Sequence, residues 1–400
     1  MQVVVFPALQ TLHFDWSKFR RLTTSGGYLP EIDGLRFVAI ASVVALHTWG
    51  YWVHRAGRVY ETMSFFDRAV EQLVSLGYYG VHLFFMISGF ILAVPFCRHA
   101  FEGGKAVDLG RYLWRRVTRL EPPYVVSMLI FFALMPWAGK GTYADLFPHL
   151  MASLAYVHNI VYGAGSIINN NAWSLEIEVQ FYLLMPLIAS LLWLPPIPRR
   201  LTLGASALAL SFNGMWLPHG FPYTILQFGQ FFLLGILLCD AWTIRWRHLS
   251  RTVRADVLGL VAALAFVAVN VRFKGLVADV MNPWLIACFF YAALRGQVHG
   301  RALSWGVIPT IGGMCYSIYL LHARVIAALV HGVLEKLPLF GVFVLDYAIV
   351  LPVCALGVLV VSAAFYLMIE QPCMNPGWPA KAADRLLGTN RRGCSPRAMP

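Results

Sequence analysis

Arg36 and His47 have the residue types and spacing to perform acid–base chemistry. They are eleven residues apart, which is three helical turns, so a helix would place both side chains on nearly the same face. His47 would lie about 16 Å deeper than Arg36, near the middle of a hydrocarbon core of about 30 Å. A neutral imidazole at that depth could take a proton from a hydroxyl. A structural histidine bonded to a neighbouring helix is the alternative interpretation.

A second pattern is cationic. Arg116 and Arg119 end a run of arginines directly before Pro122 and Pro123. Their spacing places two guanidinium groups one helical turn apart, and such a pair can bind phosphate. Basic residues beside a membrane span also commonly face anionic lipid headgroups, so spacing alone leaves both interpretations open.

Two further segments combine polar and aromatic side chains. In the first, Glu176 and Glu178 are two residues apart, so they point in different directions and cannot form a shared acid pair. Glu178 could orient or charge-balance His47, and the alternative is a helix N-terminus with an interfacial aromatic belt. In the second, Tyr319 and His322 share one helix face, as site residues or as an interface anchor.

Composition places these residues in a membrane. Hydrophobic residues make up 59% of the 400 residues and charged residues 12%, against about 45–50% and about 25% in soluble domains. This excludes a water-soluble globule and a disordered chain. The net charge is +12, but the basic residues do not form a compact patch with aromatic residues between them. Nucleic acid is therefore not a predicted partner. The seven cysteines and the motifs of the chain predict no metal site.

The expected fold is an all-α polytopic membrane bundle of about ten transmembrane helices. A membrane domain over 31–372 would follow a cytoplasmic lead-in over 1–30 and precede a cytoplasmic tail over 373–400. With the N-terminus inside, 23 of the 31 Lys and Arg residues fall in inside segments and seven in outside segments, which favours cytoplasmic termini. The predicted spans are 36–53, 78–96, 121–138, 173–194, 201–217, 223–242, 255–271, 281–295, 305–330 and 341–368, with 149–162 as an interfacial or re-entrant segment.

Six motifs, in order along nearly the whole chain, resemble the acyltransferase 3 family of integral-membrane acyltransferases of the O-antigen acetylase type. They are 32–36 with His47, 83–90, Arg116-x-x-Arg119 with Pro122, 173–182, 316–322 and 370–372. Within 83–90, Ser88 and Gly89 form a small-residue contact point, for which helix packing is the expected role. The resemblance implies a ten-helix inner-membrane protein that moves an acyl group, usually acetyl, from cytoplasmic acyl-CoA to a hydroxyl of a cell-surface or exported glycan. Acyl-CoA, a carbohydrate or other hydroxyl acceptor and membrane lipids would be its partners, and no metal would be needed.

The resemblance also assigns roles to residues. Arg36 and His47 would be the main functional pair, and Arg116 and Arg119 would handle the donor together with Arg36. His47 would act as general base with Glu178 beside it, or would carry the acyl group covalently, and the sequence does not separate these two versions. Candidates for contact with substrate are Trp173, Ser174, Tyr182, Tyr319 and His322.

Two functions from other classes stay open at this point. One is a membrane transporter of a glycan or lipid-linked sugar, although no internal repeat or broken helix is evident in the sequence. The other is a non-catalytic membrane protein that binds acyl-CoA or lipid. Acceptor identity, acyl chain length, oligomeric state and the need for a partner protein cannot be read from the sequence.

Overall fold

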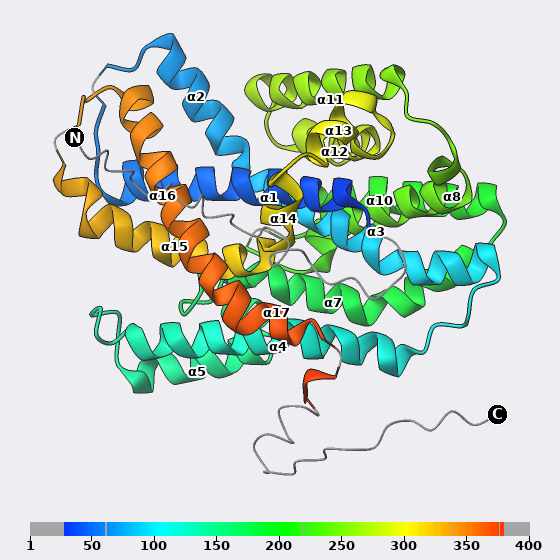
Figure 1. Cartoon of the computed structure of the whole chain (residues 1–400), viewed down its shortest axis with the longest axis horizontal. Helices are drawn as coiled ribbons and strands as arrows, with labels where there is room; N and C mark the ends of the chain where they lie inside the picture. Colours follow the sequence, from blue (N-terminus) through cyan, green and yellow to red (C-terminus); the bar gives the residue numbers. More distant parts are fainter. Residues whose placement is uncertain are drawn as a thin grey trace, which may run out of the picture.

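The structure is a computed structural model that describes residues 28–379 except positions 61, 219, 222, 338 and 376. The described part is a bundle of helices around α1 (Pro30–Trp49), which lies near its centre (Figure 1). Nearly all of the predicted lead-in over 1–30, and the predicted tail from 380 onward, lie outside the described residues.

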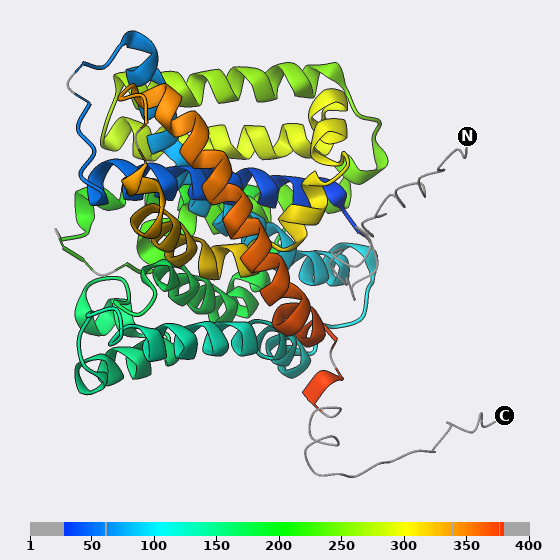
Figure 2. The same cartoon turned by 60° about the vertical axis from the view of Figure 1, so that its left-hand side comes forward.

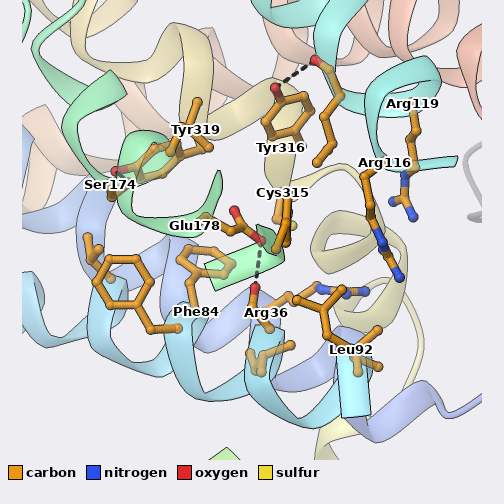
Figure 3. Close-up of a pocket in the computed structure, with 18 of the residues that line it drawn as sticks. Arg36, Phe84, Leu92, Arg116, Arg119, Ser174, Glu178, Cys315, Tyr316 and Tyr319 are labelled. Atoms are coloured by element: carbon orange, nitrogen blue, oxygen red, sulfur yellow. Dashed lines mark hydrogen bonds between the residues drawn. The ribbon is translucent and has the colours of Figure 1, made fainter. Parts of the chain in front are cut away.

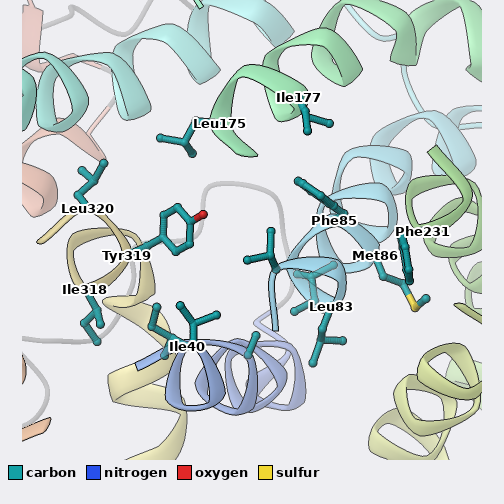
Figure 4. Packing of buried hydrophobic residues seen from close by; sticks show 14 of the residues in the cluster. Ile40, Leu83, Phe85, Met86, Leu175, Ile177, Phe231, Ile318, Tyr319 and Leu320 are labelled. Atoms are coloured by element: carbon teal, nitrogen blue, oxygen red, sulfur yellow. The ribbon is translucent and has the colours of Figure 1, made fainter. Parts of the chain in front are cut away.

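α1 is central because its apolar side chains are buried on several faces. It begins at Pro30, whose fixed φ and missing N–H suit the first helical turn. Leu35, Ala39 and Val43 are almost fully buried. The packing in Figure 4 joins α1 to α3 (Tyr79–Glu102) and α15 (Cys315–Gly332) through side chains such as Ile40 and Leu83. The π-helical turn η2 (Gly50–Arg55) continues α1.

The remaining helices form groups around this centre. Figures 1 and 2 show α11, α12 and α13 on one side of α1, α4 and α5 on the other, and α16 crossing obliquely. Their bounds are α2 (Phe65–Ser75), α4 (Leu109–Leu134), α5 (Tyr143–Leu154), α6 (His158–Tyr162), α7 (Trp173–Ile188), α8 (Pro196–Ser211), α9 (Asn213–Trp216), α10 (Ile225–Ile244), α11 (Val253–Arg272), α12 (Leu276–Arg295), α13 (Gln297–Leu303), α14 (Ile308–Gly313), α16 (Phe343–Phe365) and α17 (Gln371–Cys373). Short 3₁₀ and π turns extend or connect several of them: η3 (Leu76–Tyr78), η4 (Asn170–Ala172), η5 (Ala189–Trp193), η6 (Trp246–His248), η7 (Leu334–Lys336) and η8 (Tyr366–Glu370).

The predicted all-α polytopic bundle is confirmed, with a correction to one span. Nine helical segments in the described part are long and apolar enough to cross a membrane. The predicted span 201–217 corresponds to α8, which has 16 residues and is therefore about 24 Å long. It begins at Pro196, before the predicted start, because proline suits the first helical turn. It ends before the predicted end, where the Asn213 side chain binds the carbonyl oxygen of Leu210.

A second correction concerns the predicted span 305–330. The structure divides it into α14 and α15, which meet at Met314. Gly312 makes this junction possible, because a Cβ atom at that position would lie 1.8 Å from the carbonyl oxygen of Asp33. The backbones of α14 and α1 therefore approach closely, which brings the start of α15 next to Arg36.

Close approach also joins α3 to α10. A Cβ atom on Gly89 would lie 2.2 Å from the carbonyl oxygen of Phe232, and one on Gly235 would lie 2.2 Å from that of Met86. The predicted role of the Ser88–Gly89 pair as a small-residue packing point is confirmed at Gly89. Ser88 itself faces a different neighbour, described below.

Ion pairs gather at one end of the bundle, which we call the basic end. Arg251 pairs there with Glu31, and Arg247 pairs with Glu102 at 2.8 Å. Arg199 and Arg200 both reach the fully buried Asp240, at 2.6 Å each. Opposite charges held in contact offset the cost of removing each from water.

The opposite end has a largely buried network of uncharged polar side chains. Tyr79, Asn270 and Asn282 form a mutual hydrogen-bond network where α3 begins, α11 ends and α12 begins. The two ends of the bundle therefore differ in chemistry, and α1 runs from one toward the other.

Candidate active site

A cavity of about 110 Å³, here called the donor cavity, lies among α1, α3, α4, α7 and the α14–α15 junction. Figure 3 shows the side chains that line it. Arg36, Arg116 and Arg119 line the cavity toward the basic end, and Ser174 and Tyr319 line it at the far end. The fold thus brings together residues from distant parts of the chain around one space.

The three arginines give the cavity a cationic wall. Arg36 forms an ion pair with Asp33 at 2.5 Å. Arg116 has no ion-pair partner among the described residues, and its Nε atom is buried without a hydrogen bond. A buried, unsatisfied guanidinium N–H is costly unless an anion binds it. The wall is therefore suited to a ligand with several negative charges.

Glu178 lies farther along the same cavity. Its Oε1 accepts a hydrogen bond from the Ser88 hydroxyl at 2.7 Å (Figure 3). This contact differs from the expectation that Glu178 would orient or charge-balance His47, because the bonded partner is Ser88 of α3. The sequence predicted only a packing role for Ser88, because Ser88 is next to Gly89. It gave no signal for the hydrogen bond to Glu178.

Tyr319 and Ser174 close the far end of the cavity. The Tyr319 hydroxyl lies 2.6 Å from Ser174 Oγ and donates to the carbonyl oxygen of Asn171 at 3.1 Å. Both side chains are buried. The contact connects α15 to the start of α7. It separates the donor cavity from the His322 and His47 side chains, which lie beyond Tyr319.

His322 and His47 lie beyond this closure. His322 follows Tyr319 by three residues on α15, and the centroids of their rings are 5.8 Å apart. Its Nε2 lies 3.3 Å from His47 Nδ1, and the two imidazole rings meet edge to face with centroids 4.7 Å apart. His322 is fully buried, whereas His47 is partly exposed. Neither ring is among the residues that line the donor cavity.

The hydrogen bonds assign the tautomers of this imidazole pair. His322 Nδ1 lies 2.9 Å from the carbonyl oxygen of Tyr319, and a carbonyl can only accept, so Nδ1 carries the proton and Nε2 accepts. His47 Nδ1 lies 2.9 Å from the carbonyl oxygen of Val43 and likewise carries a proton, which it shares with His322 Nε2. In the neutral pair, the lone pair of His47 is therefore on Nε2, which has no hydrogen-bond partner in the described part of the chain.

The other predicted site residues divide into two sets. Tyr182 lines the donor cavity from α7. Trp173 does not line it and packs against Tyr223 and Phe228, with ring centroids 5.1 and 5.4 Å away.

Glu370 also lines the donor cavity, although sequence reasoning gave it no individual role. Its carboxylate accepts hydrogen bonds from the backbone N–H and the hydroxyl of Ser317, at 3.0 and 2.5 Å. These bonds cap the first turn of α15, which favours a negative charge. Membership of the 370–372 motif was the available signal for Glu370.

Comparison of the sequence with known proteins places the chain in a family. A family model described as an acyltransferase domain matches residues 29–367, which is most of the chain. The chain belongs to this acyltransferase family. The match includes α1 through α16, so every residue that lines the donor cavity except Glu370 lies within the acyltransferase domain.

Curated relatives of this acyltransferase chain are proteins of Staphylococcus aureus. O-acetyltransferase OatA of strain NCTC 8325 is 25% identical over 349 residues, which cover 78% of this chain and 53% of OatA. The protein of strain COL named "Putative O-acetyltransferase SACOL0978" is 25% identical over 333 residues, which cover 75% of this chain and 51% of that protein. The chain therefore spans about half the length of the curated relatives it matches. No solved structure matches the chain.

Proposed function

We propose that this protein is a membrane O-acyltransferase that moves an acyl group from acyl-CoA to a hydroxyl of a cell-surface or exported glycan. The observation that carries the proposal is the donor cavity, with arginines at one end and a closure in front of the His322–His47 pair at the other. Membership of the acyltransferase family and the O-acetyltransferase names of the relatives support this reaction class, with acetyl as the expected group.

The donor would bind with its phosphates against Arg116 and Arg119, with Arg36 nearby. Guanidinium groups bind phosphate oxygens through paired, charge-assisted hydrogen bonds. The pantetheine arm would follow the cavity and bring the thioester to Glu178, in the part of the cavity that Ser174 and Tyr319 close. Because CoA is a cytoplasmic metabolite, we propose that the basic end faces the cytoplasm in a bacterial inner membrane.

The chemical step would use His47 Nε2 as the base. The acceptor hydroxyl oxygen attacks the thioester carbonyl carbon while Nε2 takes the hydroxyl proton. The C–S bond then breaks, the new ester leaves with the acceptor, and the CoA thiolate takes a proton from the imidazolium. In the covalent version, His47 Nε2 attacks the thioester carbonyl carbon and the C–S bond breaks, which leaves an acyl-imidazolium and the CoA thiolate. The acceptor oxygen then attacks the acyl carbon, the C–N bond breaks, and the hydroxyl proton passes to the thiolate.

His322 would act through His47 rather than on substrate. As the acceptor of the His47 Nδ1–H, it favours the tautomer whose Nε2 can receive a proton. Tyr319 stands between the donor cavity and this pair, so transfer requires the Tyr319 ring to move away from Ser174. Closing that contact between turnovers would keep water away from the thioester.

Acceptor-dependent CoA release tests the proposed function. The full-length protein, purified into nanodiscs, is incubated with labelled acetyl-CoA, with and without bacterial glycan fractions. We expect saturable binding of acetyl-CoA, and CoA release that increases with a hydroxyl-bearing acceptor and leaves label on it as an ester. Binding without any acceptor-dependent release would contradict the proposal, because a transporter or a non-catalytic binder gives that result.

A further inference from the structure

A second hollow of about 120 Å³ lies between α4 and α7, beside the donor cavity. We call it the side groove. Six residues line the side groove alone: Leu113, Val117, Val179 and Leu183 are apolar, and Glu121 and Tyr156 are polar. The residues that line both hollows are Arg116, Leu120, Leu175, Glu178, Tyr182 and Tyr316. The side groove therefore adjoins the donor cavity along a shared wall.

The side groove leads toward the lipid-facing surface. Val117 is 46% exposed and Leu183 is 65% exposed, and both lie in helices that span the membrane. Exposed apolar side chains at this depth contact lipid tails. A group that leaves the donor cavity through the side groove would thus pass from polar surroundings at Glu178 into hydrocarbon.

The size and lining of the side groove suit a short hydrocarbon chain. An apolar cavity of about 150 Å³ stays dry and binds benzene, so about 120 Å³ holds roughly four or five carbon atoms. Each buried methylene favours binding about fourfold.

We propose that the side groove holds the hydrocarbon tail of the transferred acyl group, so that the protein accepts acyl-CoA donors of about four to six carbons as well as acetyl-CoA. The inference rests on the proposed function, because the donor cavity must hold the CoA part. The thioester would lie near Glu178 and Tyr182, where the two hollows meet, and the tail would extend between α4 and α7. Because six residues line both hollows, a tail in the side groove would lie directly beside the donor cavity, which favours this occupant over a bilayer lipid.

Chain-length dependence in matched variants tests this proposal. The dissociation constants and initial rates of CoA release are measured for acetyl-, butyryl-, hexanoyl- and decanoyl-CoA with the full-length protein in nanodiscs. Val117→Trp and Leu183→Trp fill the side groove. Leu187→Trp is the control, because Leu187 lies one turn farther along α7, is 70% exposed and does not line the groove.

We expect the wild-type protein to bind hexanoyl-CoA at least tenfold more tightly than acetyl-CoA. Each groove variant should lower the ratio of hexanoyl- to acetyl-CoA affinity at least tenfold, and Leu187→Trp should leave that ratio unchanged. Equal ratios in wild type and groove variants would overturn the inference, and so would the same loss in the control. A bilayer lipid in the groove would give that equal-ratio outcome.

Failure of the inference is separable from failure of the proposed function. If acetyl-CoA is bound and consumed but chain length has no effect, only the side-groove inference is wrong. If no acyl-CoA binds or reacts, the proposed function is wrong as well.

Discussion

The two ends of α1 carry the two principal polar residues in contrasting surroundings. Arg36 lies beside an open cavity whose wall has two further arginines, near the ion-paired basic end. His47 lies in a compact arrangement of neutral partners, bonded to the carbonyl oxygen of Val43 and to His322. One helix therefore places a guanidinium group beside an open cavity and an imidazole among neutral partners outside that cavity.

This difference shows how a bundle can keep a charged donor apart from a proton acceptor. Arg116, which has no ion-pair partner among the described residues, tolerates burial only where an anion can bind it, so it lines a cavity. A neutral imidazole has one donor and one acceptor nitrogen, and at His322 a carbonyl oxygen and the His47 ring satisfy both. The Tyr319–Ser174 contact is the boundary between the two regions.

The strongest test of the comparison removes the proton acceptor. His47→Ala should lower the rate of acyl transfer about 10²–10⁴-fold, the usual contribution of a positioned general base. Binding of acetyl-CoA should stay within about twofold, because the donor cavity is not lined by His47. Isothermal titration and CoA release measure the two quantities. Transfer at the wild-type rate would exclude both the base and the acyl-histidine versions.

The reciprocal test weakens the cationic wall. Arg116→Ala should raise the KM for acetyl-CoA about tenfold to a hundredfold with little change in kcat, since hydrogen bonds to charged groups contribute about 1.5–3 kcal/mol. Arg115→Ala is the matched control, because Arg115 is exposed and does not line the cavity. Equal effects of the two substitutions would mean that the arginines act on lipid headgroups or membrane orientation rather than on the donor.

His322 sharpens the comparison within the imidazole pair. His322→Ala should lower kcat about tenfold, the upper range for loss of one hydrogen bond, and leave the KM for acetyl-CoA unchanged. His322→Gln should recover part of the activity, because its amide oxygen can accept the His47 Nδ1–H. A merely structural role predicts a loss of folded protein without this recovery, which thermal unfolding would detect.

Tyr319 tests the boundary itself. Tyr319→Phe removes the hydroxyl that contacts Ser174 and should raise acceptor-independent CoA release several-fold, in line with about 0.5–1.5 kcal/mol for a neutral hydrogen bond. Tyr316→Phe is the control, because its hydroxyl donates to Leu120 within the cavity wall and not across the closure. Equal hydrolysis by both variants and the wild type would argue against a closure at this point.

The smallest expected effect concerns pH at a second imidazole pair, His149 and His158, whose nitrogens are 2.9 Å apart. Burial lowers the pKa of His158 below its usual value. Its stabilising contribution is therefore present above about pH 6.5 and is lost as the pH falls through the lowered pKa. We expect hydrogen-exchange protection factors in 143–169, which correct for the intrinsic pH dependence of exchange, to be a few times lower at pH 5 than at pH 7.5. His158→Asn should reduce this difference, and an unchanged difference would contradict the assignment.

Much of this could be predicted before the structure was known, and the errors have local causes. Apolar length predicted the bundle, but α8 begins and ends earlier than expected, at Pro196 and before Asn213. The hydropathy pattern also predicted one helix over 305–330. In the structure this segment is divided, and Gly312 lies there in close contact with the backbone of Asp33. The partner of Glu178 could not be predicted, because Ser88 is ninety residues away in the chain.

The sequence by itself determined the membrane class, the family and the candidates Arg36, His47, Arg116 and Arg119, since composition and spacing act through local helix geometry and burial. Only the tertiary structure decided that the arginines line one cavity, that His322 sets the tautomer of His47, and that Tyr319 separates the two. These relations depend on which helices pack together and at what rotation, and that is settled by close contacts such as Gly312 against Asp33.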